Sequence, residues 1–246
     1  MDTSTTPIPE PTTRESSWAK PVGKLKVGGL PAEALPLNVE GRQLTGPLQG
    51  FGQMWQKTYR VRLSNVQATP SEVITTWKEH FSEFWPEGNR FFAPLTGIAP
   101  GEVGVIDMAV PGGMRLSTGV MVIYADDVSF TFMMPEGHMF GGWITFSAEE
   151  SEGATDVQIQ VLIRANDPIY ELSFRLGIAH KLEDVFWQHT LSQLAAHFGV
   201  DGHAQQQVTL VDPKVQWSQA KNIWKNAGIR TALYMPVIVA RRLFRR

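Results

Sequence analysis

The chain has 246 residues, a hydrophobic content of 43% and a formal net charge of −2. This length suits one large domain with extensions or two small domains, and the hydrophobic content is enough for a sizeable core. The absence of cysteine excludes thiol nucleophiles, disulfides and cysteine-ligated metal sites. The first residues lack the basic region and apolar run of a secretory signal, so we expect a cytoplasmic protein.

The charge is distributed unevenly along the chain. Residues 214–246 contain eight basic residues and no acidic one, whereas the part before them contains 14 basic and 24 acidic residues. A basic tail on an acidic body indicates an anionic partner for the tail, either a membrane or a nucleic acid.

Residues 1–50 are rich in proline, threonine and glycine, and neither a strand period nor a helix period persists in them. This composition predicts a Pro/Gly-rich N-terminal extension. We expect its first twenty residues to be disordered and the remainder to be a loop that lies on the domain.

Regular structure is expected to begin near Met54. Tyr59, Val61 and Leu63 alternate with polar residues, which is typical of a half-buried strand. The sequence Thr-Pro-Ser-Glu at 69–72 then predicts a helix start, with Thr69 as the cap and Glu72 completing a capping box.

Five further strands are predicted over residues 103–110, 114–124, 128–134, 139–149 and 155–165, and their short connections favour antiparallel pairing. Asp167 and Pro168 then begin a long amphipathic helix that ends near Gly199, and Gly177 can kink or divide it. We therefore predict an α+β fold over residues 51–200, a curved antiparallel sheet wrapped around a long C-terminal helix. A linker over 201–213 and a separate basic amphipathic helix over 214–246 complete the predicted organisation.

This order of elements resembles the START-like or SRPBCC superfamily, whose members have the helix-grip fold. The resemblance covers residues 51–200 and includes the local sequences at 55–61, 134–138 and 164–168, which look most like uncharacterised bacterial branches. The superfamily includes lipid-transfer domains, polyketide cyclases and aromatases, and plant ligand carriers. The resemblance implies a cavity between the sheet and the long helix, and it does not assign a ligand or a reaction.

Aromatic and methionine side chains gather in the predicted first helix and strands. They can line a deformable apolar pocket, because methionine adapts to irregular ligands, or they can fill an ordinary core. The candidates for a ligand pocket are Trp77, Phe81, Met108, Met121, Phe132, Met134, Trp143 and Phe186.

Three polar residues are weak catalytic candidates. His138 lies in a glycine-rich turn, where a histidine can act as a general base or can cap the turn, and we favour the structural role. Asp107 and Tyr124 lie in strands, and a buried acid at position 107 would have a raised pKa. Arg164 and Arg115 could bind a carboxylate or phosphate headgroup if they are buried, or they could face solvent. Arg164 is in phase with polar neighbours on its strand, which favours the solvent-facing interpretation.

No metal or cofactor is expected. His180 and His189 are nine residues apart on the predicted long helix and lie about half a turn out of phase, so they cannot share a metal. A zinc site needs three or four converging ligands, and no such spacing occurs in the sequence.

The basic tail interleaves charged residues with tryptophans and aliphatic residues. This pattern fits a helix in the membrane interface or a helix docked on its own domain, and nucleic acid is the least favoured partner. The candidates for membrane contact are Trp217, Lys221, Trp224, Lys225, Arg241, Arg242, Arg245 and Arg246.

The leading functional hypothesis is binding or carriage of a hydrophobic small molecule or lipid in an internal cavity. In this hypothesis the basic tail meets an anionic membrane, which would place the protein peripherally at the inner face of the membrane. One alternative is a cyclase- or aromatase-like enzyme that uses the same cavity. The other is a non-catalytic membrane-attached scaffold with a solid core.

Overall fold

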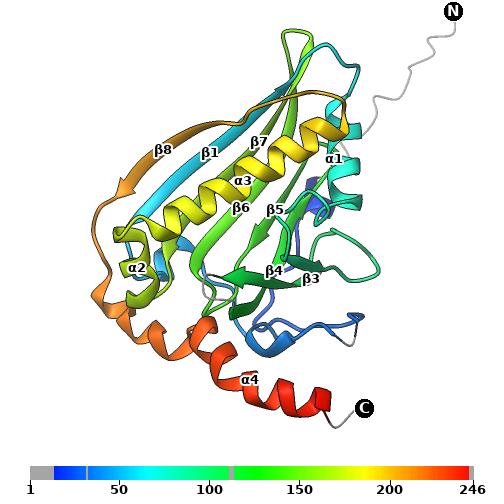
Figure 1. Cartoon of the computed structure of the whole chain (residues 1–246). Coiled ribbons are helices and arrows are strands. Elements are labelled where there is room, and N and C mark those ends of the chain that lie inside the picture. Colours follow the sequence, from blue (N-terminus) through cyan, green and yellow to red (C-terminus); the bar gives the residue numbers. More distant parts are fainter. Residues whose placement is uncertain (1–13, 32, 111–113, 244–246) are drawn as a thin grey trace, which may run out of the picture.

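A curved antiparallel sheet of eight strands forms the centre of the molecule, in the order β2-β3-β4-β5-β6-β7-β1-β8 (Figure 1). The computed structural model describes residues 14–31, 33–110 and 114–243. The predicted α+β helix-grip fold is confirmed. The strands are β1 (Met54–Leu63), β2 (Arg90–Phe92), β3 (Val103–Val110), β4 (Met114–Ala125), β5 (Ser129–Met133), β6 (Phe140–Ser151), β7 (Ala154–Ala165) and β8 (Gln205–Asp212).

Helix α1 (Pro70–Glu79) begins with the predicted capping box. The Thr69 hydroxyl accepts a hydrogen bond from the Glu72 backbone N–H, and the Glu72 carboxylate accepts one from the Thr69 N–H. This arrangement satisfies two backbone donors at the start of the helix. The helix buries Trp77 completely against Phe130 and Phe146 of the sheet.

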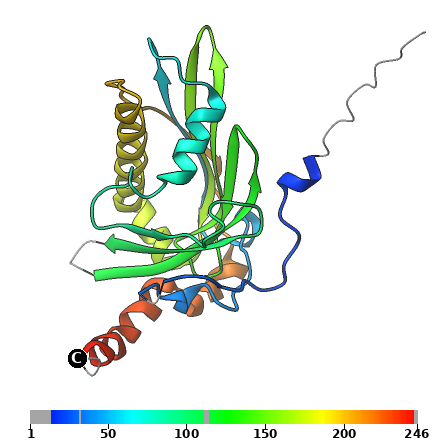
Figure 2. The same ribbon diagram turned by 90° about the vertical axis from the view of Figure 1, so that its right-hand side faces the viewer.

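The long helix is divided in two by Gly177, which has a φ of 74°. Helix α2 (Pro168–Arg175) is capped by the Asp167 carboxylate, which accepts from two backbone N–H groups, and α3 (Ile178–His197) follows Gly177. Helices α1 and α3 lie on one side of the sheet, and the N-terminal segment lies on the other (Figure 2).

Residues 14–31 and 33–50 lie along the outer face of the sheet. Leu25 and Val39 form a second, smaller core with Val103, Val105 and Met121. Disorder was expected for the first twenty residues, and this is wrong for positions 14–20, since Trp18 forms a β-bridge with Tyr124. The earlier positions lie outside the described residues. The segment contains three short 3-10 helices, η1 (Arg14–Ser17), η2 (Pro36–Asn38) and η3 (Pro47–Gln49).

The chain after α3 differs from the prediction in two ways. The expected linker contains an edge strand, because Gln205–Asp212 pair with β1 as β8. The expected single basic helix is two elements, the 3-10 helix η4 (Trp217–Lys225) and the helix α4 (Ala227–Leu243). Asn226 separates them, and its side chain donates to the Asp167 carboxylate at 2.7 Å.

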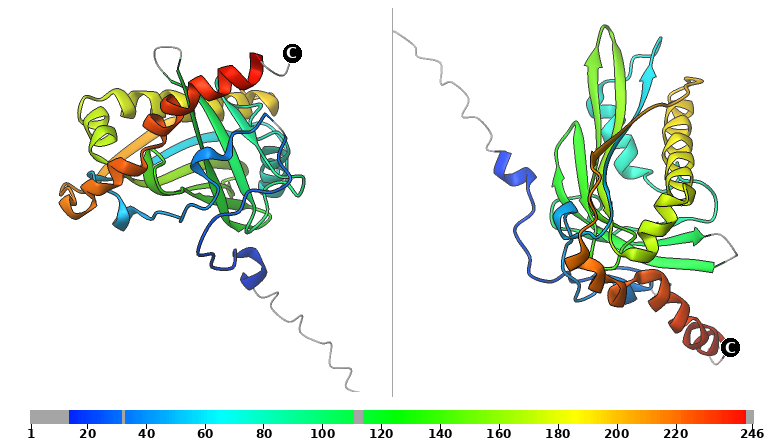
Figure 3. Two further views of the ribbon diagram at one scale, coloured as in Figure 1. Left: turned by 90° about the horizontal axis from the view of Figure 1, so that it is seen from below. Right: turned by 90° about the vertical axis from the view of Figure 1, so that its left-hand side faces the viewer.

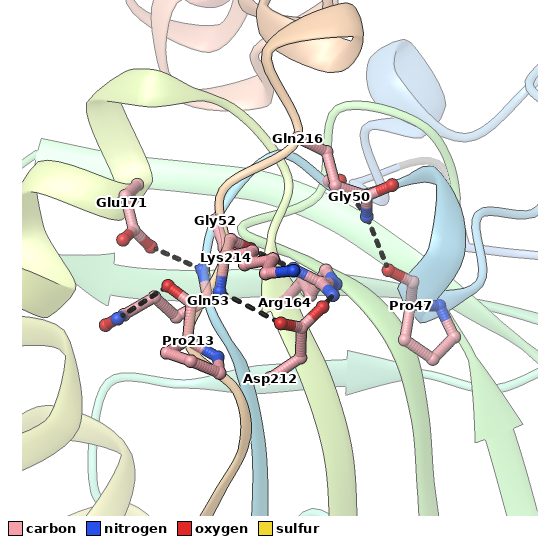
Figure 4. A network of polar contacts seen from close by, with 10 residues as sticks. All are labelled: Pro47, Gly50, Gly52, Gln53, Arg164, Glu171, Asp212, Pro213, Lys214 and Gln216. Atoms are coloured by element: carbon pink, nitrogen blue, oxygen red, sulfur yellow. Dashed lines mark hydrogen bonds and ion pairs between the residues drawn. The ribbon is translucent and has the colours of Figure 1, made fainter.

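Arg164 is buried, which contradicts its interpretation as a solvent-facing residue (Figure 4). Its side chain does lie on the outer face, as the alternation predicts, but the returning chain covers that face. The guanidinium forms an ion pair with Asp212 and donates to the backbone carbonyls of Gly52 and Lys214. Arg164 therefore fastens both flanking segments to β7.

Candidate functional site

Most of the predicted pocket residues lie in a densely packed aromatic cluster. The ring of Phe81 lies 5.1 to 5.7 Å, between ring centroids, from the five rings of Trp85, Phe91, Phe130, Phe132 and Phe146. Such edge-to-face contacts are typical of a filled core. Four of the pocket candidates belong to this cluster: Trp77, Phe81, Phe132 and Met134. Two others pack at its border: Met108 and Phe186.

Two pocket candidates lie away from the others, on the outer face of the sheet. Met121 belongs to the smaller core beneath the N-terminal segment. Trp143 precedes Ile144, which faces the main core, so the alternation of the strand directs Trp143 to the opposite face. The structure therefore does not bring the eight candidates around one space.

His138 is buried in the turn before β6. Its Nδ1 accepts a hydrogen bond from the backbone N–H of Phe140 at 3.0 Å, and burial lowers the pKa of the imidazole to about 4. A neutral histidine in this position fixes the turn, which supports the structural role over the catalytic one.

The other two catalytic candidates have partners elsewhere in the fold. Asp107 forms an ion pair with Arg115 across the β3–β4 hairpin at 2.8 Å. The Tyr124 hydroxyl donates to Asp126 at 2.5 Å, and the Tyr124 ring packs against Trp18. His138, Asp107 and Tyr124 therefore do not converge on one site.

A cluster of ionisable side chains that was not predicted from the sequence lies between β1 and α3. Lys57 is fully buried, and its ammonium group lies 2.8 Å from Oε2 of Glu183 and 2.7 Å from Oδ1 of Asp184. The Tyr59 hydroxyl donates to the same oxygen of Asp184 at 2.6 Å. Charges are rarely buried unless they are paired, so this interior polar cluster is costly to form.

The pKa values in the interior polar cluster depart from their usual ranges. Burial is the main reason that the pKa of Glu183 rises to about 7, although the Lys57 ammonium opposes this shift. Burial, together with the charge of Lys57, lowers the pKa of His180 to about 4. A carboxyl group with a pKa near neutral pH can exchange a proton under physiological conditions.

The cluster borders an aromatic wall and reaches the surface. The rings of Trp55 and Phe174 each lie 4.7 Å from the imidazole of His180, between ring centroids. Trp55 and His180 are only partly buried, and the Asp184 side chain is 25% exposed. Of these residues, only His180 was considered from the sequence, and it was considered as a possible metal ligand.

One signal in the sequence could have found this cluster. Lys57 shares its strand phase with Tyr59, Val61 and Leu63, so the same alternation that predicts their burial also places the lysine inside. On the helix, Glu183 precedes Trp187 by one turn on the buried face.

An apolar face lies at one end of the molecule. Six aliphatic side chains of α2, the turn after it and the first half of α3 are exposed there beside Arg175 and Lys181. The only acid between residues 168 and 182 is Glu171, which is buried and paired with Arg175. Helix α2 contacts η4, and both lie with α4 at this end (Figure 3). The six side chains are Ile169, Leu172, Leu176, Ile178, Leu182 and Val185.

The basic tail adds aromatic side chains to the same end. Trp217, Trp224 and Leu233 are largely exposed, Lys221 is exposed beside them, and Lys225 forms an ion pair with Glu136 at 2.5 Å. We call these four exposed tail residues, with the six aliphatic side chains, Arg175 and Lys181, the apolar–basic end. The side chains of Arg241 and Arg242, and Arg245 and Arg246 as a whole, lie outside the described residues.

The start of α4 is docked on the domain. Thr231 is buried, and its hydroxyl accepts a hydrogen bond from the Asn38 side chain at 3.0 Å. Among the described helices, none is long and apolar enough to cross a membrane. The described residues also contain no group of three or more histidine or acidic side chains that could hold a metal.

No family model matches the chain, and no curated protein matches it. Several solved structures resemble it. They include the di-domain ARO/CYC StfQ from the steffimycin biosynthetic pathway, with a TM-score of 0.48 and 9% identity over 60% of this chain and 51% of that one. The chain thus spans about half the length of StfQ.

Two further matches come from a plant and a bacterium. Major latex-like protein 151 from Panax ginseng has a TM-score of 0.39 and 14% identity over 60% of this chain and 99% of that one. The Aha1 dimer from Colwellia psychrerythraea has a TM-score of 0.38 and 17% identity over 59% of this chain and 97% of that one. At these identities and TM-scores the similarity to all three structures concerns the fold alone.

Proposed function

We propose that this protein binds a hydrophobic small molecule or lipid between the sheet and α3, and meets an anionic membrane through its apolar–basic end. The observation that carries the proposal is the composition of that end. Exposed aliphatic and tryptophan side chains occur there with lysine and arginine, and without an exposed acid between residues 168 and 182.

This composition favours a lipid surface over water. Aliphatic side chains and tryptophans insert into the boundary between headgroups and acyl chains, and each basic residue near an anionic surface adds about 1 kcal/mol of attraction. An exposed apolar area of this kind is also typical of a surface that binds a partner. Two of the acids at this end, Glu171 and Glu136, are paired with Arg175 and Lys225, which limits their repulsion of an anionic bilayer.

The interior supports the ligand-binding part of the proposal at the same end. The interior polar cluster lies beneath α3 and reaches the surface at Trp55 and His180. A hydrophobic ligand entering there would travel a short distance from the apolar–basic end. The cyclase-like alternative lacks support, since His138, Asp107 and Tyr124 each have separate partners.

Sedimentation with lipid vesicles tests the membrane part. We expect the full chain to bind vesicles that contain phosphatidylserine and to bind pure phosphatidylcholine vesicles much less. The double variant Leu176→Glu/Leu182→Glu, which places two acids on the apolar face, is expected to lose most of this binding.

A matched control distinguishes this surface from general surface hydrophobicity. Leu95 is 97% exposed on the loop between β2 and β3, and we expect Leu95→Glu to sediment with vesicles like the unmodified chain. Equal loss in Leu95→Glu, or no loss in the double variant, would contradict the proposed membrane surface. Trp224→Ala, at an 85% exposed position, is expected to give a smaller loss in the same assay.

A further inference from the structure

One buried polar atom of the interior polar cluster and one beside the cluster have neither a hydrogen-bond partner nor an ion-pair partner in the described part of the chain. One is Oε1 of Glu183, whose side chain is 3% exposed, and the other is the indole Nε1 of Trp55. Leaving a buried donor or acceptor unsatisfied costs about 1–3 kcal/mol, and more for a charged group. An acceptor left open beside a buried ammonium group indicates that a polar group from outside the chain is received there.

The charges of the cluster restrict what that group can be. Two carboxylates, Glu183 and Asp184, surround the single ammonium of Lys57. A ligand carboxylate would add a third negative charge in a region of low dielectric, where like charges repel strongly. Tyr59 cannot relieve this repulsion, because its hydroxyl already donates to Asp184.

The hydrogen-bonding capacity of the cluster fits a hydroxyl group. A hydroxyl donates one hydrogen bond and accepts others, so it can donate to Oε1 of Glu183 and accept at the same time. The donor available for the second bond is Lys57, which has three N–H groups and contacts two carboxylates.

We propose that the interior polar cluster receives the hydroxyl head of a neutral hydrophobic ligand, such as a long-chain alcohol, and discriminates against the carboxylate of a fatty acid. This inference rests on the proposed interior binding and names the ligand class. The ligand chain would pack against the aromatic wall beside the cluster, where the Phe174 ring lies 4.7 Å from His180 and 5.5 Å from Phe140, between ring centroids.

Displacement of the neutral dye Nile red from the full chain tests the preference. Dodecanol, dodecanoic acid and dodecane have the same chain length and differ in their heads. At about pH 8 the acid and Glu183 are both ionised. We expect dodecanol to bind about tenfold more tightly than dodecanoate, which corresponds to one hydrogen bond gained and a repulsion avoided.

The variant Glu183→Leu removes the acceptor and one negative charge and leaves Lys57 paired with Asp184. It is expected to bind dodecanol about tenfold more weakly and dodecanoate more tightly, which reverses the order of the two ligands. Glu171→Gln is the matched control. Glu171 is another buried acid at this end, but its partners are Arg175 and the Gln53 backbone, so the preference should persist.

The outcomes separate this inference from the proposed function. If dodecanol and dodecanoate bind equally to the unmodified chain, the inference is wrong while interior binding stands, and this comparison needs no variant to fold. If none of the three ligands displaces the dye, both the inference and the interior binding are wrong. Vesicle binding is measured separately, so the membrane surface can survive either result.

Discussion

The two halves of the space between the sheet and the helices are built differently. Around α1 and the second half of α3, rings such as Phe81, Phe130 and Phe146 pack against one another. Under the first half of α3, Lys57 and Glu183 place charges in the same interior. The aromatic half therefore contributes stability, whereas the charged half retains unsatisfied groups that a ligand can engage. Residues that lower stability and have no evident structural role are good candidates for a functional site.

The aromatic half should be the most sensitive to truncation. Phe81 is 4% exposed and contacts five rings, so Phe81→Ala is expected to lower the free energy of unfolding by about 3–5 kcal/mol. Urea titration followed by circular dichroism measures this change. Leu95→Ala, at an exposed position, should change stability by less than about 0.5 kcal/mol. A small effect at Phe81 would mean that the aromatic half is hollow rather than filled.

Removing the positive charge tests the other half. Lys57→Met leaves the buried carboxyl of Glu183 unpaired, and we expect a loss of about 3 kcal/mol near pH 8. Adding Glu183→Leu to Lys57→Met should recover most of this loss, because Asp184 is partly exposed and can be hydrated. If the double variant is no more stable than Lys57→Met, the loss arises from packing and not from an uncompensated charge.

The pH dependence of stability should carry the signature of Glu183. Its pKa is raised to about 7 in the folded chain from its usual 4.5, so between these values the folded state binds more protons. Its contribution to stability is therefore present at low pH and falls as the pH rises from about 4.5 to 7, by up to about 1.4 kcal/mol per pH unit.

His180 and His138 act in the opposite direction. Their pKa values are lowered to about 4, so the unfolded chain binds more protons and stability rises between about pH 4 and 6.5. The difference between the unmodified chain and Glu183→Gln isolates the acid, because Lys57, Asp184 and both histidines remain. Thermal melts at half-unit intervals of pH should show the stability of the unmodified chain falling relative to that of Glu183→Gln as the pH rises from about 4.5 to 7. A difference in stability that stays constant over this range would contradict the raised pKa.

Periodicity and capping chemistry predicted most of the fold. The alternation in β1, the capping box at Thr69 and the Asp167 cap are local, and the structure contains each of them. Strand β8 was missed because its residues are exposed on both faces, so they carry no alternating burial pattern. Its existence depends on pairing with β1, which is far away in the sequence.

The candidate sites were harder to predict for a similar reason. Lys57, Glu183 and Asp184 form one cluster only because β1 and α3 meet across more than a hundred residues. A single sequence does not reveal this tertiary contact, and a lysine in a strand is usually predicted to lie at the surface. The burial of Arg164 depends in the same way on segments that return to β7 from both ends of the chain.

The smallest predicted effect compares two tyrosines that each donate to an aspartate. Tyr59 is fully buried in the interior polar cluster, and Tyr124 is partly exposed on the outer face. Tyr59→Phe is expected to cost about 1 kcal/mol and Tyr124→Phe less, because water can replace the lost hydroxyl only at the exposed site. Equal costs in urea titration would show that water reaches the charged half. That half would then exchange solvent with the surface, and a ligand entering it would displace water instead of satisfying dry polar atoms.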